Sequence, residues 1–502
     1  MQLTRDVIVI NEKDSVAVAA RQLAKGEAID IGGRSIIVRD DIPVPHKIAL
    51  KEIKKDETVY KYGYPIGLAT RDIGEGEWVH VHNIRSALTA SLSYEYHPEH
   101  APVVTPIVRS ELTFNGYKRD DGSVGIRNYV YIIPTVFCVN GPLQKLAAIA
   151  NEEMPVSANF DGFIPLTHEC GCAEDGRNLS YTRSILAGMS KNPNAAGVLF
   201  VGLGCEINDL ESFKPSLGTF DPTRTKFVVF QDVEDEFETS LMLLRDLHRQ
   251  ALTYQREPVP ISNLTIGTNC AGSDGFSGLT ANPLVGEITD ILTSQGGTSV
   301  MTEVPEMFGA EQILMDRAID EKVFGDAVEL ITDFKAYYKK YGIDVSKNPT
   351  TGNYAGGLST LEEKSLGCTE KGGKSKVAAI VRFGGRIAVP GLNLLEAPGH
   401  DLVSITGQVA AGCTLILFTT GRGTPGGFAA PVLRVTTNSD IYKRKQKWND
   451  FDAGVLMSGT SMETLTKDLL DLILKVASGE VRTNTEENRY FEMGIWRDGI
   501  TT

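Results

Sequence analysis

The chain has 502 residues, of which 42% are hydrophobic and 23% charged, and its formal net charge is −14. This length exceeds what one hydrophobic core usually serves and predicts about three domains. The acidic balance argues against a nucleic-acid partner, and no apolar run is long enough to span a bilayer. No secretory signal is recognised at the start, and the seven cysteines are scattered, so we expect a cytoplasmic protein without a disulfide framework.

Residues 1–96 are predicted to form a small all-β domain. Short runs of β-forming residues, such as 35–39 and 77–82, are separated by turns that contain glycine. A polar, proline-containing linker is predicted over residues 97–111.

A pair of histidines is the main functional signal in this domain. His80 and His82 alternate with two valines, so on a strand both imidazoles would project from one face. Two such imidazoles can bind one metal ion or share a proton-transfer task. Four further polar residues of the same domain support a site here: His46, Lys47, Tyr62 and Asn83.

From about residue 112 apolar β runs alternate with helical stretches, which predicts α/β domains with largely parallel, Rossmann-like sheets over 112–262 and 263–502. Strands are predicted at 130–136, 197–202, 227–231, 264–267, 299–302, 386–389 and 415–418. Helices are predicted at 144–150, 234–252, 311–341 and 462–477.

Reactive residue types repeatedly occupy glycine-rich turns that follow apolar strands. Because ligands of open α/β sheets bind beyond the carboxyl ends of the strands, we expect these turns to converge on one crevice. They cover residues 167–172, 202–206, 268–275, 365–369, 398–401 and 419–427. None is a P-loop, and the one G-x-G-x-x-G, at 421–426, does not lead into a helix, so a dinucleotide site is not supported.

Four cysteines lie in these turns: Cys172, Cys205, Cys270 and Cys368. Four thiolates could hold a 4Fe–4S cluster, and three could do so while leaving one iron open. Their spacing matches no ferredoxin pattern, so ordinary loop cysteines are the alternative. We expect Cys138 and Cys413, which lie in apolar segments, to be free cysteines of the core.

Longer motifs resemble the altronate/galactarate dehydratase family over essentially the whole chain. Residues 45–50, 61–67 and 76–83 resemble the SAF (β-clip) domain of that family. The larger part is similar through residues 122–128, 204–206, 272–278, 281–283, 302–311, 365–369 and 420–425. Within the family, residues 303–312 and 448–454 are most similar to the branch that acts on altronate.

The resemblance implies a hydro-lyase of hexuronate (galacturonate) catabolism that converts D-altronate to 2-dehydro-3-deoxy-D-gluconate. Galactarate dehydratase and sulfolactate sulfo-lyase activities are the alternatives within the family. Outside it, an NAD-dependent sugar-acid dehydrogenase and a non-catalytic sugar-acid-binding protein remain. The resemblance also implies Fe²⁺, with Mn²⁺ as a substitute, and we expect a single ion rather than an iron–sulfur cluster. A homo-oligomer, namely a dimer, is expected.

These implications assign roles to individual residues. His80 and His82, with His46, would hold the metal or act as acid and base, and Lys47 and Asn83 would orient the substrate carboxylate. The N-terminal domain would then close as a lid over the larger part. The remaining substrate contacts are predicted for Tyr62, Arg127, Asn128, Asp274, Glu303 and Arg422.

Overall fold

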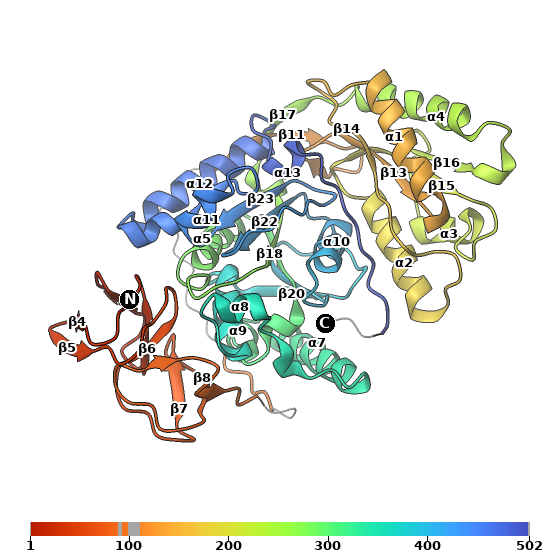
Figure 1. The fold of residues 1–502 in the computed structure, drawn as a ribbon. Helices are drawn as coiled ribbons and strands as arrows, with labels where there is room; N and C mark the ends of the chain where they lie inside the picture. Colours follow the sequence, from red (N-terminus) through yellow and green to blue (C-terminus); the bar gives the residue numbers. More distant parts are fainter. Residues whose placement is uncertain (1, 89–92, 99–110, 500–502) are drawn as a thin grey trace.

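The computed structural model describes residues 2–88, 93–98 and 111–499. Figure 1 shows a C-terminal α/β region that lies between an N-terminal β region and a middle α/β region. The N-terminal and middle regions are therefore at opposite ends of the molecule. Most of the predicted linker, residues 99–110, lies outside the described residues.

The N-terminal β region consists of short antiparallel strands, which confirms the predicted all-β fold. One sheet has the strand order β1-β2-β3-β6-β9, a second has the order β10-β8-β7, and β4 pairs with β5. The strands are β1 (Gln2–Leu3), β2 (Val7–Val9), β3 (Val16–Ala19), β4 (Ala28–Ile31), β5 (Arg34–Ile37), β6 (Lys47–Ala49), β7 (Thr58–Lys61), β8 (Tyr64–Ala69), β9 (Trp78–Val79) and β10 (Ile84–Arg85).

The predicted strand over 77–82 is wrong beyond residue 79. Strand β9 ends at Val79, and the backbone N–H groups of Asn83 and Ile84 both donate to the His80 carbonyl oxygen. This turn leaves His80 buried and His82 exposed, so the two imidazoles do not share one strand face.

The middle region has a parallel sheet of order β14-β13-β15-β16. Its strands are β13 (Tyr129–Pro134), β14 (Gly162–Pro165), β15 (Ala195–Gly202) and β16 (Thr225–Val229). Helices α1 (Asn140–Glu153) and α4 (Glu236–Ala251) cover one face, and α2 (Gly176–Ser190) and α3 (Leu210–Leu217) cover the other. Alternating buried apolar residues on the strands supply both cores, as expected for a sheet covered on both faces.

A small sheet connects the middle and C-terminal regions. It has the order β12-β11-β17 and contains β11 (Thr113–Lys118), β12 (Val124–Gly125) and β17 (Arg256–Pro260). Apolar residues of all three strands pack in one core with the C-terminal helix α12 (Met462–Ala477).

The C-terminal region has a seven-stranded parallel sheet of order β20-β21-β19-β18-β22-β23-β24. Helices α5 and α12 cover one face, and α7 and α10 cover the other. The strands are β18 (Thr265–Cys270), β19 (Thr298–Met301), β20 (Val377–Val381), β21 (Gly391–Leu395), β22 (Leu415–Thr420), β23 (Val432–Thr436) and β24 (Phe451–Asp452). The helices are α5 (Ala281–Ser294), α6 (Glu311–Met315), α7 (Glu321–Lys340), α8 (Thr351–Ala355), α9 (Leu361–Thr369), α10 (Asp401–Ala411), α11 (Ser439–Arg444), α12 and α13 (Asn484–Glu487).

The α/β prediction is confirmed, with three local differences. The predicted helix 311–341 is broken, because the Asp320 side chain accepts from Val323 N and starts a new helix, α7. The predicted strand 386–389 is wrong, and the strand of that segment is β21. Residues 365–369 belong to helix α9 rather than to a glycine-rich turn.

The glycine-rich turns do not converge on one crevice, because they belong to two separate sheets. Those at 167–172 and 202–206 follow strands of the middle sheet, whereas those at 268–275 and 419–427 follow strands of the C-terminal sheet. Within the described ranges, no helix is both long enough and apolar enough to cross a membrane.

Candidate functional site

Two histidines of the N-terminal region lie together beside a tryptophan. The ring centroids of His46 and His80 are 4.7 Å apart, and Trp78 stacks on His80 at 5.5 Å with an interplanar angle of 8°. Trp78 Nε1 donates to His46 Nδ1 over 3.2 Å, and His46 also has a hydrogen bond with the backbone of Ala355. The hydrogen bond from Trp78 and the ring contact with His80 fix the orientation of His46.

Among the buried side chains that the structure describes, His80 is the histidine with an unpaired ring nitrogen. Its side chain is buried, and Nδ1 has no hydrogen-bond partner. Burial, followed by the charges of Lys47 and His46, lowers the pKa of His80 to about 3. The imidazole is therefore neutral at pH 7 and can accept a proton or bind a cation.

A buried ion triad attaches the N-terminal region to helix α9. Lys47 Nζ donates to Glu363 Oε2 and to the Gly357 carbonyl oxygen, each over 2.8 Å, and Lys61 Nζ donates to Glu363 Oε1 over 2.8 Å. Although burial acts to raise the pKa of Glu363, the two lysines hold it well below its usual range. Burial, opposed by Glu363, lowers the pKa of Lys47 to about 8. These contacts place Lys47 in the interface, and its predicted contact with substrate stays a prediction.

Two other predicted residues support the same interface. Asn83 accepts from His80 N over 2.9 Å and donates to the Trp78 carbonyl oxygen over 2.8 Å, so it fixes the turn that carries His80. Tyr62 has φ +62°, and its hydroxyl packs on Gly278, where a Cβ would come within 2.5 Å of it. Asn83 thus holds the turn that carries His80, and Tyr62 packs the N-terminal region against the C-terminal region.

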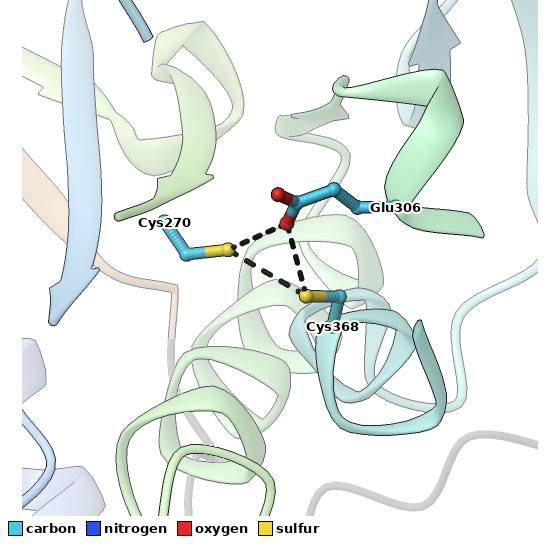
Figure 2. A group of neighbouring side chains, drawn as sticks. All are labelled: Cys270, Glu306 and Cys368. Atoms are coloured by element: carbon cyan, nitrogen blue, oxygen red, sulfur yellow. Dashed lines mark hydrogen bonds between the residues drawn. The ribbon is translucent and has the colours of Figure 1, made fainter. Parts of the chain in front are cut away.

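A second group of reactive side chains lies inside the C-terminal region, and Figure 2 shows it. Cys270 at the end of β18, Glu306 in the short 3-10 helix η4 (Val304–Met307) and Cys368 in α9 converge there and are buried. Cys270 Sγ lies 3.2 Å from Glu306 Oε2 and 3.6 Å from Cys368 Sγ, and Cys368 Sγ lies 3.3 Å from Glu306 Oε2. We call these three residues the thiol–carboxylate group.

Two lysines neutralise this group. Lys364 Nζ donates to Glu306 Oε1 over 2.6 Å, and Lys371 Nζ donates to Cys270 Sγ over 2.9 Å. Burial acts to raise the pKa of Glu306, but the two lysines outweigh it and lower the pKa to about 2. The hydrogen bond with Cys368, followed by burial, raises the pKa of the Cys270 thiol, and burial raises the pKa of Glu303, so a divalent cation bound here would favour the charged forms of both groups.

Glu303 adds a strained acidic residue beside the group. Its φ is +64°, in the left-handed region that bulky residues avoid, and such strain is concentrated at functional sites. Glu303 Oε2 accepts from Cys270 N over 3.1 Å, whereas Oε1 is buried with no hydrogen-bond partner. Its predicted contact with substrate is compatible with this free oxygen.

One segment, residues 348–357, connects the two groups. Lys364 Nζ donates to Asn348 Oδ1 over 3.0 Å, the ring of Tyr354 is 6.4 Å from that of His80, and Gly357 accepts from Lys47. A Cβ at Gly352 would lie 3.7 Å from the Arg422 side chain. The segment therefore links the histidines to the thiol–carboxylate group, and the three together are the candidate site where the N-terminal and C-terminal regions meet.

The other predicted substrate contacts divide into available and occupied residues. Arg422 is exposed, and among the described residues it has no ion-pair partner. Asp274 is fully hydrogen bonded, to Ser277, Thr437 and Asn438 among others, and holds the strand-end loops together.

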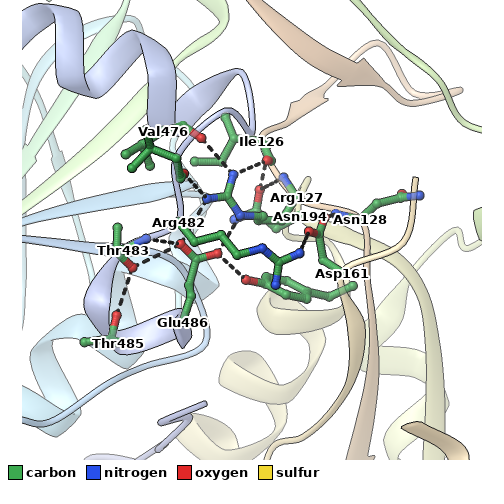
Figure 3. A network of polar contacts seen from close by, with 12 residues as sticks. Ile126, Arg127, Asn128, Asp161, Asn194, Val476, Arg482, Thr483, Thr485 and Glu486 are labelled. Carbon is green, nitrogen blue, oxygen red and sulfur yellow. Dashed lines mark hydrogen bonds and ion pairs between the residues drawn. The ribbon is translucent and has the colours of Figure 1, made fainter. Parts of the chain in front are cut away.

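Arg127 and Asn128 lie elsewhere, in the buried network of Figure 3. Arg127 Nε and Nη2 donate to the Glu486 carboxylate over 2.5 and 2.9 Å, and Nη1 donates to the Val476 carbonyl oxygen over 2.8 Å. Asn128 uses both ends of its amide, accepting from Arg119 and donating to backbone carbonyls. The Arg127 contacts join the middle region to the C-terminal helices, and the predicted role of both residues in binding substrate stays a prediction.

Sequence reasoning missed several members of the site: Glu306, Tyr354, Glu363, Lys364 and Lys371. The adjacent Glu363 and Lys364 of α9 point to different partners, the N-terminal lysines and Glu306. The adjacent opposite charges of Glu363 and Lys364 within a buried helix could have revealed these residues, because buried charged side chains require charged or hydrogen-bonding partners.

The predicted metal ligands separate into different places. Within the described ranges, the thiol–carboxylate group is the one set of three His, Cys, Asp or Glu residues whose ligand atoms all lie within 4.8 Å of one another. Its short distances, burial and soft donors fit a divalent transition metal. His80 and His82 form no such set, and Cys172 and Cys205 lie in the middle region.

Comparison with known proteins agrees with this architecture. Residues 5–87 match the family described as "Altronate/galactarate dehydratase SAF domain". Residues 116–252 match "D-galactarate dehydratase/Altronate hydrolase, second domain", and 261–501 match "D-galactarate/Altronate dehydratase, C-terminal".

Full-length relatives give the same result. The chain is 45% identical over 498 residues to "Altronate dehydratase" of Bacillus subtilis (strain 168), which covers 99% of this chain and 100% of the relative. It is 42% identical over 494 residues to "Altronate dehydratase" of Escherichia coli (strain K12), covering 98% and 99%. It is 34% identical over 501 residues to "Galactarate dehydratase (L-threo-forming)" of the same organism, covering 96% and 94%. The chain therefore belongs to the altronate/galactarate dehydratase family, which confirms the resemblance seen in its sequence motifs.

Proposed function

We propose that the chain is a hydro-lyase that removes water from D-altronate to give 2-dehydro-3-deoxy-D-gluconate. The observation that carries the proposal is the identity of 45% and 42%, over nearly full lengths, to two proteins named altronate dehydratase. Identity to the relative named galactarate dehydratase is lower, at 34%. A homo-dimer remains a prediction that light scattering of the purified chain tests.

The reaction needs a base at C2 and an acid at the leaving 3-hydroxyl. His80 is our candidate for proton transfer, because it is neutral at pH 7 and its Nδ1 is unpaired inside the site. Arg422 is suited to the substrate carboxylate by its planar pair of donors. The free Oε1 of Glu303 can accept a substrate hydroxyl. Burial of His80 and Glu303 strengthens the contacts that these two side chains would make with substrate.

The family resemblance implies Fe²⁺ or Mn²⁺, and the thiol–carboxylate group is where we propose that the metal binds. Cys270, Glu306 and Cys368 would supply the ligands, leaving room in the metal's coordination for substrate oxygens. When bound, a divalent ion stabilises the negative charge that the carboxylate gains as C2 loses its proton.

A substrate comparison tests the proposed activity. We expect the anaerobically purified, Fe²⁺-loaded chain to form a 2-keto acid from D-altronate with a higher kcat/KM than from galactarate or sulfolactate. The reaction should proceed without a nicotinamide cofactor, which separates it from a dehydrogenase. Product formation from none of the three acids would refute a lyase function, and a preference for galactarate or sulfolactate would correct the substrate.

Removing a proposed metal ligand tests the metal site. The experiment uses a Cys172→Ala background, because Cys172 is an exposed thiol that could itself bind Co²⁺. In this background we expect Glu306→Gln to weaken Co²⁺ binding more than about tenfold, since changes around a metal have effects of at least this size. Binding is followed by thiolate-to-cobalt absorption, which should weaken in Cys368→Ala, because only the Cys270 thiolate would remain. His82→Ala is the control and should leave the titration unchanged. Loss of binding in His82→Ala with retention in Glu306→Gln would move the metal to the histidines.

A further inference from the structure

Three cysteines lie at neighbouring positions of the middle region, outside the site described above. Cys138 follows β13, Cys172 lies in the loop after β14, and Cys205 follows β15. Strand β13 pairs in parallel with both β14 and β15, so the three loops leave the same edge of the sheet. All three cysteines are exposed, which corrects the expectation that Cys138 is a core residue. We call them the three-cysteine group.

The Cys138 thiol lies near the other two thiols, close enough to Cys172 and to Cys205 for their charges to interact. The three cysteines are 34 and 33 residues apart along the chain, by subtraction of 138 from 172 and of 172 from 205. Their meeting is thus a product of the sheet topology, and no local sequence motif reveals it.

Backbone hydrogen bonds fix the three loops against each other. Phe137 N donates to the Cys170 carbonyl oxygen over 3.0 Å, which joins the first loop to the second. Ile207 N donates to the Cys172 carbonyl oxygen over 3.1 Å, which joins the second to the third. Thr135 Oγ1 donates to Glu206 over 2.8 Å, which joins the first to the third. The loops therefore form a connected frame without any ligand.

Two further features hold the loops that carry Cys172 and Cys205 in place. A Cβ at Gly171 would lie 2.0 Å from the Thr135 carbonyl oxygen, so only glycine fits beside Cys172. The Glu206 carboxylate accepts from the backbone N–H groups of Leu203, Gly204 and Cys205 over 3.0, 2.7 and 2.9 Å. These bonds fix the backbone at Cys205.

The nearby candidates for a fourth ligand are directed elsewhere. Cys170 is buried, and its Sγ accepts from Arg497 over 3.5 Å. His168 is also buried, with Nε2 bonded to the Pro134 carbonyl oxygen and Nδ1 accepting from Cys170 N. The three-cysteine group therefore offers three thiolates and one open side toward solvent.

The spacing of the sulfur atoms distinguishes a single ion from a cluster. Thiolates on one tetrahedral Zn²⁺, each about 2.3 Å from the metal, lie about 3.8 Å apart. The three sulfur atoms here do not all lie within 4.8 Å of one another. An iron–sulfur cubane accepts a wider set, because each thiolate binds a different iron.

We propose that Cys138, Cys172 and Cys205 bind a 4Fe–4S cluster through three of its irons, leaving the fourth iron open toward solvent. Each thiol gives up its proton and forms one sulfur–iron bond, and the inorganic sulfide and iron come from cluster assembly. This centre is distinct from the thiol–carboxylate group, because its three cysteines follow strands of the middle sheet, whereas Cys270 ends a strand of the C-terminal sheet.

Anaerobic reconstitution of the full chain with iron and sulfide tests the proposal. We expect about four irons and four acid-labile sulfides per chain in the cluster, with broad visible absorption and an electron paramagnetic resonance signal after reduction. Cys138→Ala, Cys172→Ala and Cys205→Ala should each lose the sulfide and the absorption. Since these cysteines are exposed, circular dichroism of the variants should match that of the unmodified chain.

Cys368→Ala is the matched control, because it removes a thiol of the other group, and it should keep the labile sulfide. Loss of sulfide in Cys368→Ala with retention in the other three variants would place the cluster in the C-terminal region and overturn the proposal. Reconstitution that yields no labile sulfide would overturn it as well, whether the cysteines bind Zn²⁺ alone or form a disulfide between Cys138 and Cys172.

Discussion

Replacing His80 with alanine is expected to lower kcat about 10²–10⁴-fold, the usual effect of removing a group that transfers a proton. The side chain is buried, neutral at pH 7 and has an unpaired Nδ1, so its loss removes a reactive atom from the site. The measurement is steady-state turnover of the Fe²⁺-loaded enzyme with D-altronate. Because the His80 ring is buried against Trp78 and His46, circular dichroism of the variant should confirm that it is folded at the assay temperature.

His82→Ala is the matched control for this variant. His82 is two residues away and also contacts Trp78, at 5.2 Å between ring centroids, but it is exposed. We therefore expect its kcat to stay within about threefold of the unmodified enzyme, well short of the loss expected for a proton-transfer group. Equal losses in the two variants would show that Trp78 packing, rather than proton transfer by His80, explains the effect.

Local sequence patterns predicted most of the fold, because strand and helix periodicities arise from neighbouring residues. The helix predicted at 462–477 has the bounds of α12, and the strand predicted at 197–202 lies within β15. The errors occur where a side chain overrides the pattern. Asp320 caps a new helix inside an apolar-periodic stretch, and Thr360 accepts from Glu363 N to start α9 in a glycine-containing segment.

The site was less predictable, because its members come together from distant parts of the chain. Cys270 and Cys368 are 98 residues apart, and Glu306 lies 36 residues from Cys270. The sequence identified both cysteines as reactive but grouped them with Cys172 and Cys205, since all four lie in or near glycine-containing segments. Only the sheet topology separates them into two regions.

For the histidine pair, the sequence indicated the correct segment but not its geometry. The H-x-H spacing drew attention to the correct segment, yet the geometry inferred from it assumed a strand. Asn83 replaces that strand by a turn, because its side chain accepts from His80 N and donates to the Trp78 carbonyl oxygen. The structure therefore pairs His80 with His46 from another strand-end loop instead of with His82.

The largest stability effect is expected for Glu363→Gln. This change leaves the buried ammonium groups of Lys47 and Lys61 without a counter-charge, which costs about 3–5 kcal/mol when one partner of a buried ion pair is removed. The measurement is urea unfolding at pH 7 followed by tryptophan fluorescence, since Trp78 lies in the N-terminal region. Glu463→Gln, which breaks the exposed Lys467 pair of α12, is the control and should leave the free energy of unfolding nearly unchanged, because exposed ion pairs contribute little.

The acid dependence of unfolding and a rescue variant complete this test. Because the folded-state pKa of Glu363 is depressed, its contribution is present above the pKa of a free glutamate and is lost as the pH falls through the folded value. The stability difference between Glu363→Gln and the unmodified chain should therefore shrink in acid.

Combining Lys47→Met, Lys61→Met and Glu363→Leu should regain most of the loss, since a buried ion pair and apolar residues of similar volume are often equivalent. If Glu363→Gln unfolds at the same urea concentration as Glu463→Gln, the triad is not what attaches the N-terminal region to α9.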